Sequence, residues 1–159
     1  MASAHRDRMR DQDENARRKA AMAALAAAPE ADLQALWRDW EVAVEARLLR
    51  GPETGLVTLR GRIGGGGAPF NFGEATVTRA TVKLASGEIG HAYALGRDRE
   101  KARISATIDA LWQRPDMRAA VEDGIIAPLR ARAAETDARR RAETAATRVD
   151  FFTMVRGED

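Results

Sequence analysis

Four consecutive glycines, Gly64 to Gly67, form the segment whose composition best suits phosphate binding. Glycine backbones can point several N–H groups at one anion, as phosphate-binding loops do. Such a loop also needs a Lys followed by Ser or Thr and a helix directly after it, whereas Ala68 and Pro69 follow this run. The run therefore favours a flexible hairpin loop between two strands over a phosphate site.

His91 is the candidate for a general base, because it is the only histidine outside the charged N-terminal segment. Glu74 and Asp98 are the carboxylates that a small independent hydrolase or transferase would use with it. Its alternation with Ile89 and Tyr93 is more typical of a half-buried histidine on a strand. The chain has no cysteine and no Gly-x-Ser-x-Gly motif, so we assign no catalytic residue and no metal ligand.

The segment GEATVTR, which ends at Arg79, combines a carboxylate, two hydroxyls and an arginine. On a strand, Glu74, Thr76 and Thr78 project from the same face. This polar stripe could hold a phosphate with help from an arginine, or it could form a ladder of cross-strand threonine contacts with surface ion pairs. The residues leave both alternatives open.

Two of the four phenylalanines lie in the terminal segment VDFFTMVRG. Chain ends are normally polar, and burying a large apolar side chain contributes about 1.5–3 kcal/mol. We therefore expect another polypeptide to cover this segment. Its apolar residues are the predicted partner-binding set: Val149, Phe151, Phe152, Met154 and Val155.

The periodicity of the apolar residues predicts the elements that must position these groups. Helices are expected over about 15–28, from Pro29 onward, from the N-cap Asp98 to Pro115, and over 128–148. The third of these helices should lie on a sheet, because it carries a clean apolar stripe: Ile104, Ile108, Leu111 and Trp112. The fourth is charged apart from a narrow alanine seam, which favours a solvated arm that reaches a partner, with a helix folded back on the domain as the alternative.

Four segments have the composition of strands, and short turn segments separate them. They cover 42–49, 55–63, 74–84 and 88–95 and predict an antiparallel meander. The chain is therefore expected to be α+β, with a small antiparallel sheet of about four strands packed by helices, a C-terminal helical arm and an apolar tail.

The expected organisation is a mobile N-terminal extension over 1–16, an α+β domain over 17–128, and the arm with its partner-docking tail over 129–159. The absence of cysteine suits a reducing cytoplasm. A net charge of +2 gives little attraction to membranes or nucleic acid. We therefore predict neither as a partner, although Arg60 and Arg62 keep nucleic-acid binding open as a third hypothesis.

Three stretches together resemble the G subunit of the bacterial carbon-phosphorus lyase core complex, the PhnG family. They are GEATVTRATVKL at 73–84, GRDREKARISATIDAL at 96–111 and RVDFFTMVRGED at 148–159. The resemblance runs from about Arg17 to the end of the chain, and the terminal stretch is its most specific part.

The resemblance implies a small α+β subunit that associates with the H, I and J subunits of a hetero-oligomer, and it admits the ATP-binding-cassette subunits K and L. In such systems the G, H, I and L components act together to displace adenine from MgATP with an alkylphosphonate, chiefly through the I subunit. It implies an accessory role with no cofactor bound by this chain. Arg79, Arg97 and Arg156 match arginines of the three stretches and are expected to face the triphosphate or the phosphonate, because arginine binds such groups through two parallel hydrogen bonds.

Overall fold

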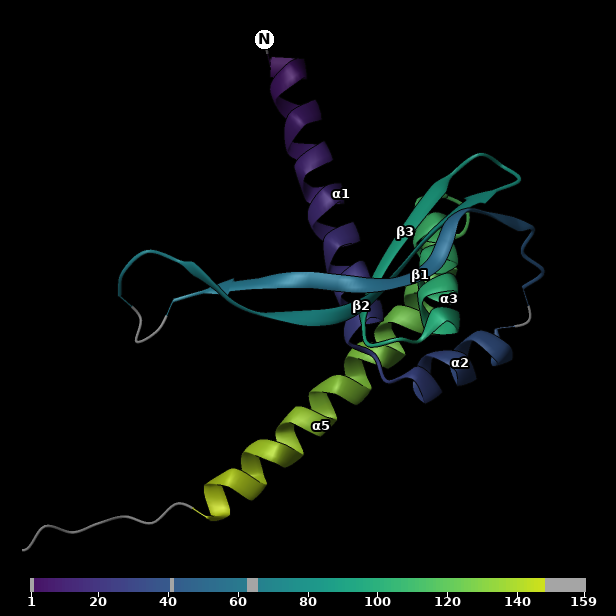
Figure 1. Ribbon diagram of the computed structural model, residues 1–159. Helices are drawn as coiled ribbons and strands as arrows, with labels where there is room; N and C mark the ends of the chain where they lie inside the picture. Colours follow the sequence, from purple (N-terminus) through teal and green to yellow (C-terminus); the bar gives the residue numbers. More distant parts are fainter. Residues whose placement is uncertain (1, 41, 63–65, 148–159) are drawn as a thin grey trace, which may run out of the picture.

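The computed structural model describes residues 2–40, 42–62 and 66–147. Three antiparallel strands in the order β1-β2-β3 form one sheet (Figure 1): β1 is Ala46–Gly61, β2 is Phe70–Leu84 and β3 is Ile89–Leu95. The link from β2 to β3 is a tight turn in which Gly87 takes a φ of 114°, as the sequence predicted. The α+β class and the meander are confirmed.

The prediction of separate strands over 42–49 and 55–63 was wrong, because one sixteen-residue strand, β1, covers half of the first segment and most of the second. Gly51 and Pro52 lie inside β1, and the pairing with β2 shifts register between Leu48 and Arg50 and again between Arg50 and Glu53. Gly51 has a φ of 45°, so a bulge absorbs the two residues that resemble a turn. A proline costs little at a bulge of an edge strand.

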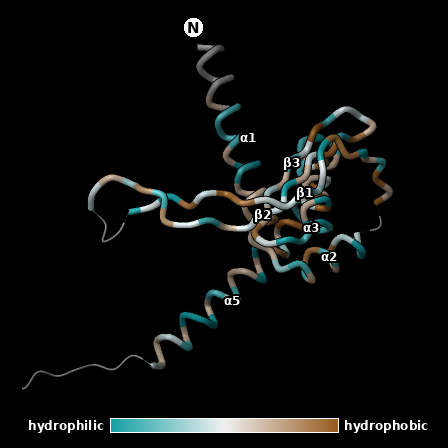
Figure 2. The backbone as a smooth tube through the Cα atoms, viewed as in Figure 1, coloured by the Kyte–Doolittle hydropathy of each residue, from teal (hydrophilic) through white to brown (hydrophobic). Residues whose placement is uncertain are grey.

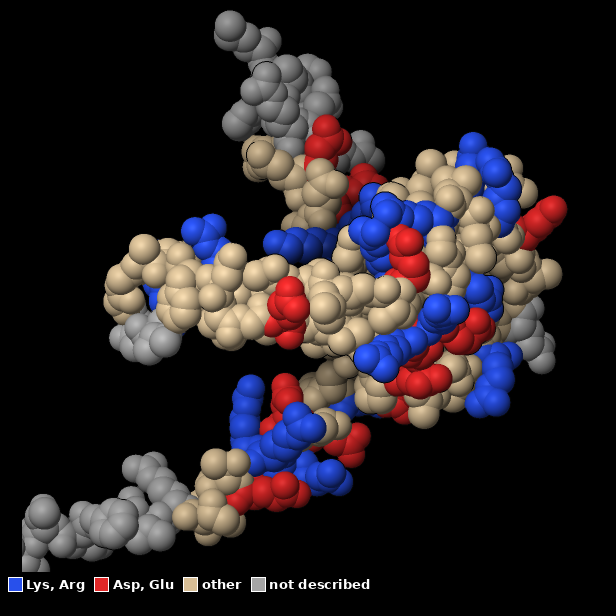
Figure 3. All heavy atoms as spheres, in the orientation of Figure 1, with Lys and Arg blue, Asp and Glu red and all other residues tan. Residues whose placement is uncertain are grey.

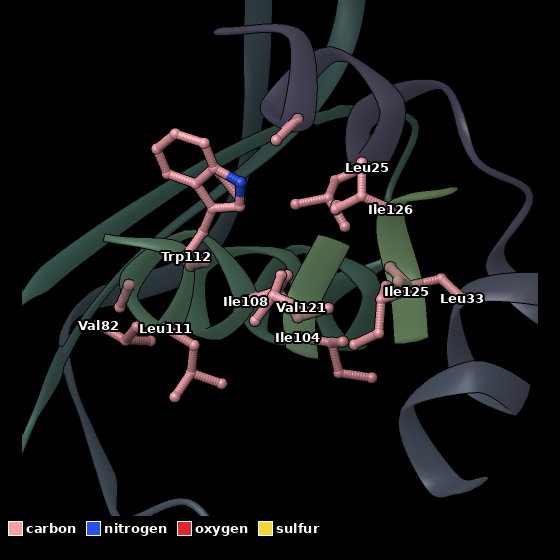
Figure 4. Close-up of a cluster of buried hydrophobic side chains, with 14 of the residues drawn as sticks. Leu25, Leu33, Val82, Ile104, Ile108, Leu111, Trp112, Val121, Ile125 and Ile126 are labelled. Atoms are coloured by element: carbon pink, nitrogen blue, oxygen red, sulfur yellow. The ribbon is translucent and has the colours of Figure 1, made fainter. Parts of the chain in front are cut away.

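Helix α3, Arg99–Trp112, covers one face of the sheet and forms the centre of the core (Figure 4). Asp98 caps it by accepting a hydrogen bond from the Lys101 N–H at 2.8 Å, which confirms the predicted N-cap. The predicted apolar stripe of α3 is buried. The side of α3 that lies on β3 contains Ala106 and Ala110. Alternate residues of β2 and β3 are buried in the same core: Ala80, Val82, Leu84, Ala92 and Ala94.

Helix α1, Ala2–Ala27, is tied to the sheet through one buried carboxylate. Asp109 of α3, whose side chain is 1% exposed, accepts two hydrogen bonds from Arg18, at 2.8 and 2.7 Å. It also accepts one from the backbone N–H of His91 at 2.9 Å. A single side chain thereby fixes α1, α3 and β3 relative to one another.

Helix α1 begins at Ala2, thirteen positions before the predicted start at Asn15. Apolar periodicity is the pattern that predicts a helix, and the first half of α1 has none. The helix crosses residue 16 without a break; the mobility of residues 1–16 and the proposed domain boundaries stay predictions. Helix α2, Glu30–Asp39, follows Pro29 as expected and buries Leu33 in the core.

The segment 116–124, between two of the predicted helices, is largely helical. Helix α4, Arg118–Val121, continues through a π-helical turn, η1, at Glu122–Ile126 into α5, Ala127–Ala146. Pro128 explains the wider turn, because a proline has no N–H and its ring would clash with the carbonyl four residues before it. In η1 the Ala127 N–H instead donates to the Glu122 carbonyl, five residues back.

Helix α5 leaves the domain as an arm, as Figures 1 and 2 show. Leu129 is buried, but every residue from 130 to 147 is exposed. One ion pair, from Arg132 to Asp32 at 2.8 Å, joins the arm to α2. The predicted solvated arm is therefore confirmed, and the alternative of a helix folded back on the domain is wrong. Among the described residues, no helix is long and apolar enough to cross a membrane.

Candidate functional site: the open face of the sheet

The face of the sheet opposite α3 is not covered by any described helix. Directly opposite residues of neighbouring strands lie on the same face, so the register arranges this open face in rows. The rows are Arg47, Lys83 and Ile89; Arg50, Thr81 and His91; Glu53, Arg79 and Tyr93; Gly55, Val77 and Leu95. The first two rows are mainly basic and the fourth is apolar. The open face therefore changes from cationic to apolar along the strands.

Arg79 lies at the centre of this face, where it contacts both neighbouring strands. Its Nε donates to Glu53 Oε1 at 2.7 Å and its Nη1 donates to the Tyr93 hydroxyl at 3.4 Å. The hydrogen bond to Tyr93, followed by that to Glu53, raises the pKa of Arg79. Hydrogen bonds from Arg50 and then Arg79 lower the pKa of Glu53. Both arginines therefore stay charged and are positioned by one carboxylate.

The four rows of the open face contain four cationic side chains but only one carboxylate, Glu53. Arg47 and Lys83 lie directly opposite each other, an arrangement of like charges that disfavours pairing. Neither side chain has a hydrogen bond or ion pair to another of the described residues. Arg50 and Arg79 share Glu53 and retain further donors. A shallow hollow of about 170 Å³ lies beside Glu53, Arg79 and Tyr93, so this face can accept an anionic group.

The structure does not bring together the residues of the predicted independent enzyme. The ring of His91 is exposed and its Nδ1 lies 3.1 Å from Thr81 Oγ1. Glu74 is seven positions along β2 from Thr81, which is roughly 23 Å at about 3.3 Å per residue, and Asp98 caps α3. Within the described ranges, no group of three histidines and carboxylates could hold a metal ion.

The polar stripe of GEATVTR lies on the opposite face, toward α3. Thr78 is fully buried; its hydroxyl donates to the Gly96 carbonyl at 2.8 Å and lies 3.0 Å from the Thr54 hydroxyl. Because the proton of Thr78 is used on Gly96, Thr54 must be the donor in the pair. The cross-strand threonine ladder is therefore the correct alternative at Thr78, and this hydroxyl is not available to a phosphate.

Arg97, the other described member of the predicted substrate-binding residues, is not part of the cluster around Arg79. Arg97 follows Gly96, where the chain turns from β3 toward α3, and it is exposed. Gly66 and Gly67 lie in the link between β1 and β2, which confirms the hairpin loop. Arg156 and the partner-binding set lie outside the described residues: Val149, Phe151, Phe152, Met154 and Val155.

Sequence reasoning identified Arg79 but missed Arg47, Arg50 and Lys83. Lys83 shares the face of Arg79 by simple alternation along β2, whereas only the register of β1 against β2 places Arg47 and Arg50 on that face. The bulge at Gly51 and Pro52 sets that register, so counting along β1 does not reveal the cluster.

Two comparisons with known proteins agree. The model of the family described as phosphonate metabolism protein PhnG matches residues 16–157. A protein of Rhizobium meliloti (strain 1021), named alpha-D-ribose 1-methylphosphonate 5-triphosphate synthase subunit PhnG, is 53% identical over 144 residues, which cover 91% of this chain and 92% of that protein. The resemblance seen in the three sequence stretches is therefore confirmed, and this chain belongs to the PhnG family.

Proposed function

We propose that this chain is an accessory subunit of a ribose 1-methylphosphonate 5-triphosphate synthase in phosphonate catabolism. The similarity to the Rhizobium meliloti subunit, which spans nearly all of both chains, is the observation that carries the proposal. The assembled enzyme would use MgATP and an alkylphosphonate and release adenine. The chain would act in the cytoplasm within a hetero-oligomer that contains the H, I and J subunits, and with the K and L subunits as further partners.

Omission of this subunit tests the proposal. Adenine release from MgATP and methylphosphonate is measured with the G, H, I and L components together, and then with each component left out. We expect the complete mixture to form adenine, the mixture without this chain to form almost none, and this chain alone to form none. Adenine release by the isolated chain would instead favour an independent enzyme, and an unaffected rate without it would contradict the proposal.

We also propose that Arg79 contacts the triphosphate or the phosphonate of the bound substrate. It lies on an open, cationic face, and Glu53 and Tyr93 orient its guanidinium. A hydrogen bond to a charged group contributes about 1.5–3 kcal/mol. Arg79→Ala should therefore lower kcat/KM of the assembled synthase by about 10- to 100-fold, and Arg79→Lys, which keeps the charge but not the planar fork, should lower it less.

Arg60→Ala is the matched control, because it removes an exposed arginine that lies seven positions along β1 from Glu53, the residue opposite Arg79. Arg79→Ala leaves Glu53 paired with Arg50, so both variants should assemble with the other subunits like the unaltered chain. Equal kcat/KM for the two variants would contradict a substrate contact at Arg79. Arg97→Ala and Arg156→Ala test the other two predicted contacts in the same assay.

A further inference from the structure

No described strand pairs with the outer edge of β1, because β1 is at the end of the sheet. Its two halves differ in how this edge is protected. The half that begins at Ala46 contains register shifts and Pro52, and both features block the addition of another strand. From Glu53 to Leu59 the pairing with β2 is regular. This stretch contains no proline, bulge or lysine, and the next register shift follows it, between Leu59 and Arg60.

The register shows which backbone groups of β1 point outward. The Leu84 N–H donates to Glu88 at 2.9 Å, and the Gly96 N–H donates to the Thr76 carbonyl at 2.9 Å, so even-numbered residues of β2 bond toward β3. The odd-numbered residues of β2 consequently bond toward β1. Their partners in β1 are Gly55, Val57 and Leu59, whereas three residues between them direct their N–H and C=O groups away from the sheet: Thr54, Leu56 and Thr58.

From Leu56 onward this edge belongs to a two-stranded hairpin that extends beyond the rest of the sheet (Figure 1). We define the distal arm as residues 56–61 of β1 and 70–76 of β2, which pair with each other but not with β3. Figure 3 shows few charged side chains on it. Its large apolar residues are exposed, with Leu56 at 64% and Phe72 at 59%. A surface of this kind marks an interaction site.

We propose that β1 accepts a strand from another subunit of the synthase along residues 54–58, so that the sheet continues into that subunit. This inference rests on the proposed function. The three outward residues would exchange main-chain hydrogen bonds with the added strand. The fitting segment is extended, lacks proline, is uncharged, and places an apolar side chain beside Leu56.

A second copy of this chain is a poorer occupant. Two copies could pair edge to edge about Leu56. The paired segment of five residues would be only about 17 Å long, however, and a strand with its side chains is only about 10 Å thick. Such a contact would bury on the order of 350 Å² in total, whereas stable interfaces bury about 1,200–2,000 Å². It would also leave Phe70 and Phe72 exposed. A larger partner can pair with the edge and cover the phenylalanines together.

Amide hydrogen exchange measured by NMR distinguishes added pairing from general burial. In the isolated chain, the N–H groups of Gly55 and Val57 should already be protected by β2, and those of the three outward residues should exchange fast. In the complex with the other synthase subunits, the outward N–H groups should become at least tenfold slower: Thr54, Leu56 and Thr58. Fast exchange of these three amides in an assembled complex overturns the inference and leaves the proposed function intact.

Two further outcomes would identify a different occupant and overturn the proposal. Protection in the isolated chain that increases with protein concentration would indicate a second copy. Protection in the isolated chain that disappears on deletion of residues 148–159 would indicate the chain's own terminal segment. Failure of the unaltered chain to copurify with the other subunits would instead contradict the proposed function itself.

Leu56→Pro tests the edge by mutation. The Leu56 N–H points outward, so proline removes no hydrogen bond between β1 and β2, but it removes one donor and blocks the edge. We expect the affinity for the other subunits to fall at least tenfold. Leu56→Thr is the matched control, because it changes the side chain and keeps the N–H, and it should cost much less. Equal affinities of the two variants, each with a melting temperature close to that of the unaltered chain, would overturn the inference.

Discussion

Replacing Asp109 with alanine is expected to lower the free energy of unfolding by about 3–5 kcal/mol, because the change removes the acceptor of a largely buried ion pair. Arg18 would lose both of its hydrogen bonds to this carboxylate, and the backbone N–H of His91 would lose its partner. A domain of this size is stabilised by only about 5–15 kcal/mol in total. Urea unfolding followed by circular dichroism should show a large fall in the transition midpoint.

Asp116→Ala is the matched control for this prediction. Asp116 also accepts two hydrogen bonds from one arginine, Arg114, but its side chain is 62% exposed. An exposed ion pair contributes at most about 1 kcal/mol, so this variant should unfold close to the unaltered chain. Equal losses for the two variants would show that burial of Asp109 does not determine its contribution.

A double replacement separates the contribution of the two charges to stability from that of side-chain packing. Arg18→Met alone leaves the Asp109 carboxylate buried without its cation and should also be strongly destabilising. Combining it with Asp109→Leu removes both charges and fills the space with apolar atoms, which is often close to neutral. The His91 N–H remains without a partner in this variant, so we expect recovery of most, but not all, of the lost stability.

Apolar periodicity predicted the core helix α3 well. Its stripe of Ile104, Ile108, Leu111 and Trp112 is buried in the core, because a helix of this pattern has one face that must leave water. The first half of α1 could not be predicted in this way. Its residues have no apolar stripe, and hydropathy alone does not distinguish a polar helix from an irregular segment.

The candidate site was only partly predictable for a different reason. A single residue such as Arg79 can be chosen for its type, but its neighbours are set by strand register. Gly51 and Pro52 resemble a turn in sequence, whereas the structure uses them as a bulge. The bulge determines that Glu53, and not another residue of β1, lies opposite Arg79. Pairing energies between distant strands decide this choice, and they are not visible in a local pattern.

That a partner covers the apolar residues of the terminal segment remains a prediction. The structure shows a second exposed apolar surface elsewhere in the chain. The distal arm exposes Leu56 and Phe72, and apolar residues of this size are normally covered in a working assembly. Partner binding would therefore involve the sheet as well as the terminal segment.

Gly90→Ala is expected to be as damaging as the loss of Asp109, because β3 lies directly on the backbone of α3 at this position. A Cβ added to Gly90 would lie 1.9 Å from the Ala106 carbonyl oxygen and 2.5 Å from the Ala110 nitrogen. Backbone atoms cannot rotate away, so β3 would have to separate from the helix. Overpacking of a core typically costs about 1–3 kcal/mol and sometimes more, and we expect at least 3 kcal/mol by urea unfolding.

Gly73→Ala provides the comparison within the same sheet. A Cβ at Gly73 would meet no atom within 4 Å, and glycine in a strand interior is less favourable than alanine by about 0.5–1 kcal/mol. This variant should therefore be neutral or slightly more stable. Because Gly90 is on β3 next to His91, its close contact with α3 also determines the distance between the sheet and this helix. If Gly90→Ala unfolds like Gly73→Ala, the sheet cannot lie this close to α3, and the arrangement of the rows around Arg79 would be wrong as well.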